Sequence, residues 1–337
     1  MPQAIKFSAR PPAAISVMPN PYLNLNLRWW PKRGTDIAWK TTAVGNLATP
    51  RGYLGAALMD QKIYTFGGSK PDPQTPLATV ESFDIQTHHS TAVPNLQMPH
   101  GRAAAAVIKM PSGQVYVCGG GSDGETSSKT CYECLLPNGP WNARSDMLQA
   151  ASCSAAAPGP DGKVYVIGGL RGDTYWKTVQ RYDFGSGTWT QAHDLHMARF
   201  DAAAAVANGK IYVFGGIDAL GELVTTVEEY DPATNKWTVL PHEMLTPRYD
   251  LAAVTGSNGR IYAIGGMYQC SAVDLVEEFD PVTKTWAQKT PMPTARYGAA
   301  AVATTDGRVF VLGGWKKVSN TFSAIGVIEE GTLPTYA

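Results

Sequence analysis

The sequence predicts an all-β fold, a propeller of six blades, on three repeating observations. Glycine doublets recur at intervals of 52, 49, 47, 50 and 48 residues. A short apolar segment such as KIYTF or RVFVL precedes each doublet, and an alanine-rich segment lies upstream of it. A strand such as TVEEYD, a turn and a strand opening with tryptophan follow the doublet. Four short strands per period of about 50 residues are typical of propeller blades. The doublets are Gly67-Gly68, Gly119-Gly120, Gly168-Gly169, Gly215-Gly216, Gly265-Gly266 and Gly313-Gly314.

Each part of the repeat has a physical reason. Small residues on the first strand suit the crowded centre where blades converge. The doublet lets the backbone adopt conformations that are closed to residues with a Cβ atom. The third-strand aromatic and the fourth-strand tryptophan lie seven residues apart, and we expect them to pack between neighbouring blades. These residues are Phe83, Tyr182, Tyr230 and Phe279 on the third strand, and Trp189, Trp237 and Trp286 on the fourth.

With six doublets in this register, the chain resembles the kelch-repeat family over roughly residues 37–331. The resemblance implies a six-bladed kelch β-propeller at 37–331, an N-terminal extension at 1–36 and a C-terminal tail at 332–337. The extension carries the segment LRWWP. It is interpreted either as a tail lying over the side of the propeller or as an anchor on a second protomer or a partner.

Three departures from the repeat are informative. Cys134 takes the place of the third-strand aromatic in the second repeat, and Ser90 takes the place of tryptophan in the first. The sixth repeat ends without a fourth strand, whereas a lone tryptophan segment, DIAWKTTA, precedes the first repeat. We therefore expect the strand around Trp39 to be the outer strand of the sixth blade. This closure of the ring leaves no long exposed blade edge.

Composition excludes several classes of function. The formal net charge is zero and no basic stripe stands out, so nucleic acid is not an expected partner. The sequence contains no stretch of about 18 apolar residues, so a membrane-spanning helix is not expected. The N-terminus lacks the apolar core of a secretory signal. Five scattered cysteines do not form a disulfide framework, which favours a reducing, cytoplasmic location. Cys131 and Cys134 lie in one strand on opposite faces, so we interpret them as packing thiols.

An arginine recurs before the innermost strand, and a fivefold repeat favours a structural role over a ligand contact. The arginines are Arg51, Arg102, Arg199, Arg248 and Arg296, with Ala151 in the third repeat. The next two positions vary along the chain. In kelch domains that bind peptides, the residue directly after this arginine faces the ligand. By that resemblance, Ser152, Phe200, Tyr249 and Tyr297 line the mouth of the channel.

The loops after the doublets add further candidates for the same face. Exposed aromatic side chains are costly unless they contact something, and tyrosine and tryptophan are enriched at binding hot spots. The alternative is that some of these aromatics pack against one another. The candidates in these loops are Trp176, Tyr268, Trp315 and Lys316.

Asp201 and Asp250 occupy equivalent places in adjacent repeats, each after an aromatic residue. Two carboxyl groups in one pocket divide acid and base roles if their environments separate their pKa values. The alternative is that each carboxylate caps a loop or pairs with an arginine. His193 and His196 make a poor metal site by themselves, and neither a metal nor a cofactor is expected.

Two classes of function remain open. The first is a binding module that takes a protein, a peptide or another ligand on the aromatic loop face, as a monomer or a dimer. The second is a small-molecule enzyme, such as an isomerase or mutarotase-like or cyclase-like protein of specialised metabolism, that uses Asp201 and Asp250. The resemblance favours the binding module, because that is the commoner use of kelch domains.

Overall fold

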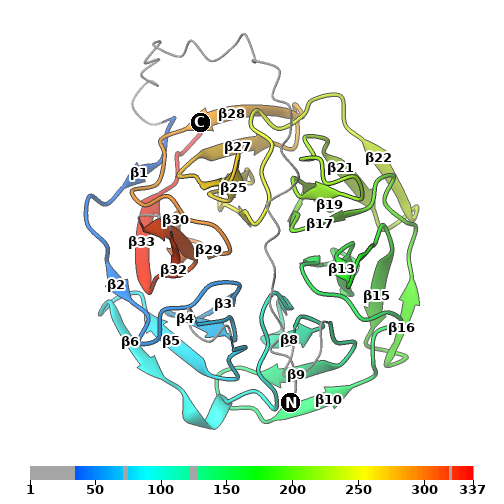
Figure 1. Cartoon of the computed structure of the whole chain (residues 1–337), viewed down its shortest axis with the longest axis horizontal. Helices are drawn as coiled ribbons and strands as arrows, with labels where there is room; N and C mark the ends of the chain where they lie inside the picture. Colours follow the sequence, from blue (N-terminus) through cyan, green and yellow to red (C-terminus); the bar gives the residue numbers. More distant parts are fainter. Residues whose placement is uncertain (1–34, 71–74, 122–126, 319–320, 337) are drawn as a thin grey trace.

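The computed structural model describes residues 35–70, 75–121, 127–318 and 321–336. Within these residues the chain forms six antiparallel sheets of four or five strands, arranged around a central axis, and four two-stranded ribbons (Figure 1). The predicted all-β, six-bladed propeller is confirmed. The segment LRWWP and most of the expected extension at 1–36 lie outside the described residues.

Each blade runs outward from its innermost strand. Blade 1 contains β3 (Gly55–Met59), β4 (Lys62–Phe66), β5 (Val80–Asp84) and β6 (His89–Ala92). Blade 2 contains β7 (Ala106–Lys109), β8 (Gln114–Cys118), β9 (Cys131–Leu135) and β10 (Trp141–Arg144). Blade 3 contains β11 (Ala155–Pro158), β12 (Val164–Ile167), β15 (Val179–Asp183) and β16 (Thr188–Gln191).

The second half of the chain repeats this order. Blade 4 contains β18 (Ala203–Ala207), β19 (Lys210–Phe214), β21 (Glu228–Asp231) and β22 (Lys236–Val239). Blade 5 contains β23 (Ala252–Thr255), β24 (Ile261–Ile264), β27 (Val276–Asp280) and β28 (Thr285–Lys289). Blade 6 contains β29 (Ala300–Ala303), β30 (Arg308–Leu312), β33 (Val327–Thr332) and the N-terminal strands β1 (Ala38–Trp39) and β2 (Gly45–Asn46).

Short two-stranded β-ribbons lie at one end of the propeller, which we call the loop face. It is formed by the loops that follow the glycine doublets and the loops that lead into the innermost strands. The ribbons are β13 (Leu170–Arg171) with β14 (Thr174–Tyr175), β17 (Arg199–Phe200) with β20 (Ile217–Asp218), β25 (Met267–Tyr268) with β26 (Ser271–Ala272), and β31 (Trp315–Val318) with β32 (Thr321–Ala324). A 3-10 turn, η1 (Pro94–Leu96), lies between blades 1 and 2. The described part of the chain holds no helix long and apolar enough to cross a bilayer.

The ring closes through the N-terminal segment, as predicted. β1 and β2 both pair antiparallel with β33, and Figure 1 shows the blue β1 beside the red β33. The indole N–H of Trp39 donates to the carbonyl of Thr290 at 3.0 Å, in the loop that leads into blade 6. Trp141, Trp189 and Trp237 make the same bond in their own blades. Trp39 therefore takes the place of the tryptophan missing from the sixth repeat.

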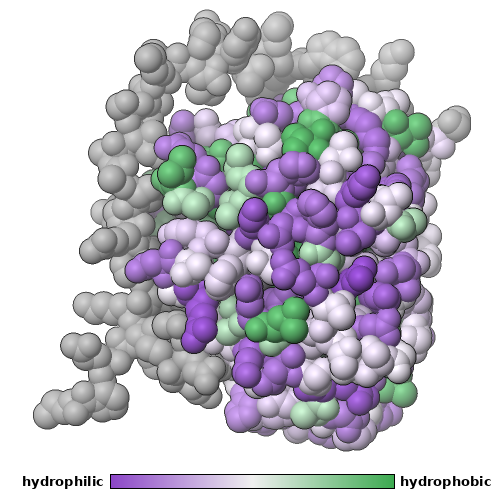
Figure 2. All heavy atoms as spheres, turned by 90° about the vertical axis from the view of Figure 1, so that its right-hand side faces the viewer, coloured by the Kyte–Doolittle hydropathy of each residue, from purple (hydrophilic) through white to green (hydrophobic). Residues whose placement is uncertain are grey.

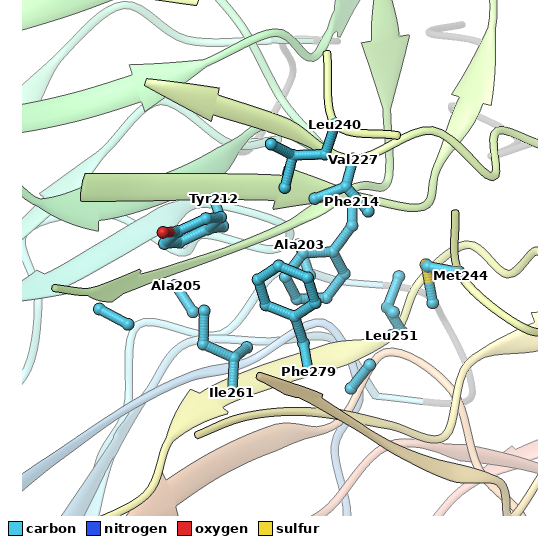
Figure 3. Packing of buried hydrophobic residues seen from close by; sticks show 12 residues of the cluster. Ala203, Ala205, Tyr212, Phe214, Val227, Leu240, Met244, Leu251, Ile261 and Phe279 are labelled. Carbon is cyan, nitrogen blue, oxygen red and sulfur yellow. The ribbon is translucent and has the colours of Figure 1, made fainter. Parts of the chain in front are cut away.

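The core lies between blades, where aromatic side chains from one blade meet those of the next. In Figure 3, Tyr212 and Phe214 of blade 4 lie against Phe279 and Ile261 of blade 5, with small alanines beside them. Tyr212 and Phe279 have ring centroids 5.3 Å apart, and Tyr165 and Tyr230 repeat the contact one blade earlier at 5.5 Å. The expected packing of third-strand aromatics between blades is confirmed.

The glycine doublets join each blade to the next. In blade 4, Gly215 has φ +68°, and a Cβ atom there would lie 2.6 Å from the carbonyl oxygen of Arg248. The N–H of Gly216 donates to that same carbonyl at 2.8 Å. The equivalent bond from Gly314 to the carbonyl of Arg51 joins blade 6 to blade 1. A side chain at the first glycine would therefore push neighbouring blades apart.

The recurring arginines are buried and structural, which confirms that interpretation. Arg51 donates through Nη1 to the carbonyls of Gly67 and Thr79, and its Nη2 lies 2.5 Å from Glu81. The same arginine–glutamate pair occurs in three further blades. These pairs are Arg199–Glu228 at 2.7 Å, Arg248–Glu277 at 3.4 Å and Arg296–Glu329 at 3.0 Å.

Blades 2 and 3 show that the two positions of this pair change together. In blade 3, Ala151 replaces the arginine and the neutral Gln180 replaces the glutamate. The Gln180 amide then bonds to both the N–H and the carbonyl of Gln149. In blade 2, Arg102 remains, and the ring of Tyr132 stands at the glutamate position, 5.9 Å from the guanidinium. At this position of the repeat, each described glutamate is thus paired with the arginine of its own blade.

One cysteine prediction was wrong. Cys118 and Cys131 are directly opposite on β8 and β9 and form a disulfide, so Cys131 is not a free packing thiol. Cys134 is a buried free thiol that packs in a different core cluster from Cys131. The inference that the two residues face opposite sides of their strand is therefore confirmed.

Candidate functional site

A ring of main-chain hydrogen bonds surrounds the central axis at the loop face. It is built from the residue two positions after each recurring arginine, or after Ala151 in blade 3. Each of these residues donates its N–H to the carbonyl of the equivalent residue in the preceding blade, at 2.7–3.1 Å, and all have φ between 51° and 57°. The ring residues are Tyr53, Ala104, Cys153, Asp201, Asp250 and Gly298.

The ring residues have left-handed backbone conformations, and they line one shared cavity. Non-glycine residues in this conformation cost about 1–3 kcal/mol each, and the closed set of hydrogen bonds offsets that cost. Side chains at the ring positions line a cavity on the axis together with those of the next residue in each blade. Five blades therefore present a ring side chain to the same small space, and the sixth presents Gly298.

Four ring side chains form a continuous polar chain. The Tyr53 hydroxyl donates to Oδ2 of Asp250 at 3.2 Å. The carboxyl groups of Asp250 and Asp201 are hydrogen-bonded to each other, and the Cys153 thiol bonds to Asp201 on the far side. The structure thus brings together the two aspartates that stood at equivalent repeat positions.

Burial raises the pKa values of Asp201 and Asp250, and the neighbouring carboxylate adds to the rise for Asp250. Burial raises the pKa of Asp201 to about 6, even though the hydrogen bonds with Cys153 and Asp250 oppose the rise. Burial and the neighbouring charge of Asp201 hold the pKa of Asp250 well above its usual range. Two carboxyl groups in contact do not ionise independently, so the pair retains a shared proton towards neutral pH.

The cavity is small and carries no positive charge of its own. Its volume is about 140 Å³, below the 300–1,000 Å³ that is typical of drug-sized ligand sites. No lysine, arginine or histidine is among the described residues that line it. Ala104 and Gly298, which flank Tyr53 in the ring, add little bulk to the cavity. The cavity therefore suits a group of a few non-hydrogen atoms.

Aromatic residues border one half of the ring, where Phe200, Tyr249 and Tyr297 precede the ring residues of blades 4, 5 and 6. Phe200 stacks on Tyr175 with centroids 5.0 Å apart. Tyr297 makes an edge contact with Tyr53 at 6.1 Å. All three predicted residues are half-buried, so part of each remains accessible at the loop face. Their backbone pairs with the loop after the doublet rather than lining the cavity itself.

The remaining predicted residues differ in how far their side chains are buried. Ser152 is 3% exposed, and its hydroxyl lies 3.0 Å from that of Ser127, so it does not reach the mouth. Trp315 is also 3% exposed and packs against Tyr53, as the alternative of mutual aromatic packing expects. Trp176, Tyr268 and Lys316 are half-buried in the loops around the mouth.

Tyr53 and Cys153 were missed by the sequence analysis. Both were visible as varying residues in the second position after the arginine or its replacement, the position that holds the aspartates. The resemblance directed attention to the first position instead. Among the described residues, no group of three metal-ligating side chains converges, and His196 contacts Glu228 at 2.9 Å.

The pKa shift of Asp201 makes a prediction about stability. The pKa of Asp201 is raised on folding. Its contribution to stability is therefore fully present below its pKa in the unfolded chain, near 4, and is lost as the pH rises through about 6. Asp201→Asn is therefore expected to be more stable than wild type at pH 8, by on the order of 1–3 kcal/mol, since a tenfold change in acid dissociation corresponds to about 1.4 kcal/mol. Urea unfolding at pH 4 and pH 8 measures the effect. A variant that is less stable than wild type at pH 8 contradicts it.

The fold and the ring define a six-bladed propeller with an acidic cavity at one mouth. Residues 141–314 match the family described as the KLHDC2/KLHL20/DRC7 Kelch-repeats domain, and residues 50–97 match the Kelch motif. The chain therefore belongs to the kelch-repeat family.

Curated relatives share parts of the propeller. The chain is 34% identical over 141 residues to alpha-scruin of Limulus polyphemus, covering 38% of this chain and 15% of that protein. It is 29% identical over 159 residues to Kelch-like protein 35 of Mus musculus, covering 47% and 25%. An F-box/kelch-repeat protein of Arabidopsis thaliana is 34% identical over 140 residues, covering 37% of each chain. The matches thus span well under half of these relatives.

Proposed function

We propose that this kelch propeller binds a segment of a partner polypeptide on the loop face, centred on the aromatic residues around the ring. The observation that carries the proposal is the set of half-exposed aromatics, Phe200, Tyr249 and Tyr297, that directly precede ring residues. Aromatic side chains supply large contact areas at low entropic cost and dominate binding hot spots. Kelch homologues generally bind proteins, which supports the same assignment.

The flank of the propeller is a poorer candidate for the contact. Figure 2 shows that the flank over blades 3 and 4 is mostly hydrophilic, with apolar residues scattered singly. Single exposed apolar residues are normal on monomeric proteins and do not mark an interface. The loop face, in contrast, gathers aromatic groups around one cavity.

Selection from a displayed peptide library tests the proposal. Peptides that bind the wild-type protein are expected to lose about tenfold or more in affinity with Phe200→Ala or Tyr249→Ala, as is typical of hot-spot residues. Phe184→Ala is the matched control, because this aromatic is 40% exposed but follows β15 at the opposite end of the blade. Peptides that bind both loop-face variants as tightly as wild type would overturn the proposal.

A small-molecule enzyme is the second candidate, and the contact between Asp201 and Asp250 favours it. A carboxyl pair that shares a proton supplies an acid and a base in one cavity. Native mass spectrometry of protein from its own source tests this candidate. A small molecule retained at one per chain, and lost in Asp201→Asn and Asp250→Asn, supports it. A co-purifying polypeptide with no small molecule supports the binding module.

A cytoplasmic location stays a prediction. The redox state of Cys118 and Cys131 in protein from its own source tests it, because thiol pools in the cytosol keep disulfides reduced. Thiols at both positions agree with that location, whereas the disulfide that the structure places between them counts against it.

A further inference from the structure

The charge balance of Asp201 and Asp250, which are half-buried, differs from that of the fully buried glutamates. Among the described residues six glutamates are buried, and each lies within 4 Å of an arginine or lysine nitrogen. The fold therefore neutralises its buried carboxylates with a built-in cation. The two ring aspartates lie together in a cavity whose described lining contains no cation.

We propose that the cavity receives a basic group, the guanidinium or ammonium of an arginine or lysine side chain of the bound polypeptide. This assignment rests on the proposed binding function. The bound cation neutralises the ring aspartates, as the arginines neutralise the buried glutamates. A guanidinium offers five donors and an ammonium three, and both match a site built from acceptor oxygens.

The groups around the acids suit a cation. Oxygens of Asp201, Asp250 and Tyr53 belong to three ring positions around the cavity, and the small residues Ala104 and Gly298, on either side of Tyr53 in the ring, add little bulk to it. The cavity of about 140 Å³ holds the end of a side chain rather than a whole drug-sized ligand. Aromatic rings at Tyr53 and Tyr297 border its approach, and aromatic faces attract cations.

Trp315 packs beside Tyr53 but is not among the described residues that line the cavity. The indole N–H of Trp315 is buried and has no acceptor among the described residues. It stands over Gly52, where a Cβ atom would lie 2.0 Å from the indole nitrogen, and its ring is 6.4 Å from that of Tyr53. Trp315 therefore packs against Tyr53 and Gly52 and does not itself contact the cavity.

Three probes test the proposal by calorimetry on the full chain. Acetyl-arginine-methylamide carries the guanidinium on a peptide backbone, acetyl-citrulline-methylamide is its neutral analogue, and butylguanidinium lacks the backbone. We expect the arginine probe to bind at least tenfold more tightly than the citrulline probe. Equal binding of these two probes, or no binding of either at millimolar concentration, would overturn the proposal.

The variants locate the binding and identify its source. Asp201→Asn and Asp250→Asn are expected to weaken the arginine probe at least tenfold, whereas Asp173→Asn, an exposed change of the same charge between β13 and β14, leaves it unchanged. Folding of each variant is checked by its unfolding transition. Butylguanidinium that binds as tightly as the arginine probe would overturn the polypeptide source in favour of a free amine.

Failure of this inference is distinct from failure of the proposed function. Library peptides that need Tyr249 but contain no lysine or arginine would leave polypeptide binding in place and overturn the cation site. Conversely, tight binding of the arginine probe with no peptide selected at the loop face would overturn the proposed function and, with it, the polypeptide source.

Discussion

Removal of residues 1–46 is expected to unfold the propeller, because it takes away both strands that close blade 6. The deletion strips β1 and β2 from β33 and removes Ile37, which is buried in the core between blades 5 and 6. It also breaks the Trp39 bond to Thr290 and the pair between Lys40 and Glu330 at 2.7 Å. The loss is expected to be on the order of 5 kcal/mol or more, comparable with the whole stability of a typical domain. Circular dichroism during heating measures it.

Truncation of residues 1–34 is the control, since it leaves every contact described above in place. This shorter deletion is expected to melt within a few degrees of the full chain. Addition of a synthetic peptide of residues 35–48 to the longer deletion is expected to restore a cooperative transition, because an extended peptide pairs with an open sheet edge. A 1–46 deletion that melts like the full chain contradicts the closure.

Arg199→Ala is expected to destabilise the protein by about 3–5 kcal/mol, because it leaves Glu228 buried without its guanidinium partner. The change also removes the Nη1 bond to the Thr226 carbonyl. Urea unfolding at pH 7 measures the loss. The effect is expected to be far larger than that of removing an exposed ion pair, such as Lys129–Asp146, where screening by water leaves little net stabilisation.

The double variant Arg199→Ala with Glu228→Gln separates charge from packing. It copies the combination that blade 3 carries as Ala151 and Gln180. We expect it to recover roughly half of the loss, because the unpaired charge disappears whereas the space left by the guanidinium remains. A double variant as unstable as Arg199→Ala would show that the buried charge is not the cause.

Part of the site was predictable and part was not. Asp201 and Asp250 were singled out because they fall at equal places in adjacent repeats, and the structure brings their carboxyl groups into contact. Whether the first or the second residue after the arginine lines the cavity did not follow from the pattern. The second residue does, because a backbone with φ near 55° turns that side chain towards the axis. Tyr53 and Cys153 were therefore overlooked.

The disulfide was missed for a related reason. Cys118 ends β8 next to a glycine doublet, and Cys131 begins β9 after a loop of twelve residues. Their pairing depends on the register between these two strands, which places the two residues directly opposite. The number and spacing of the cysteines in the sequence do not reveal that register.

The sequence by itself determined the number of blades, the strand that closes the ring and the structural role of the arginines, because these follow from a local pattern that recurs along the chain and from its departures. Only the tertiary structure decided which side chains share the cavity. Five ring bonds join residues about 50 positions apart, and the sixth joins Tyr53 to Gly298. Each repeat contributes one ring residue to a space that exists only when all six blades have closed around it. A property of that shared space, such as its unbalanced acidity, is invisible in any single repeat.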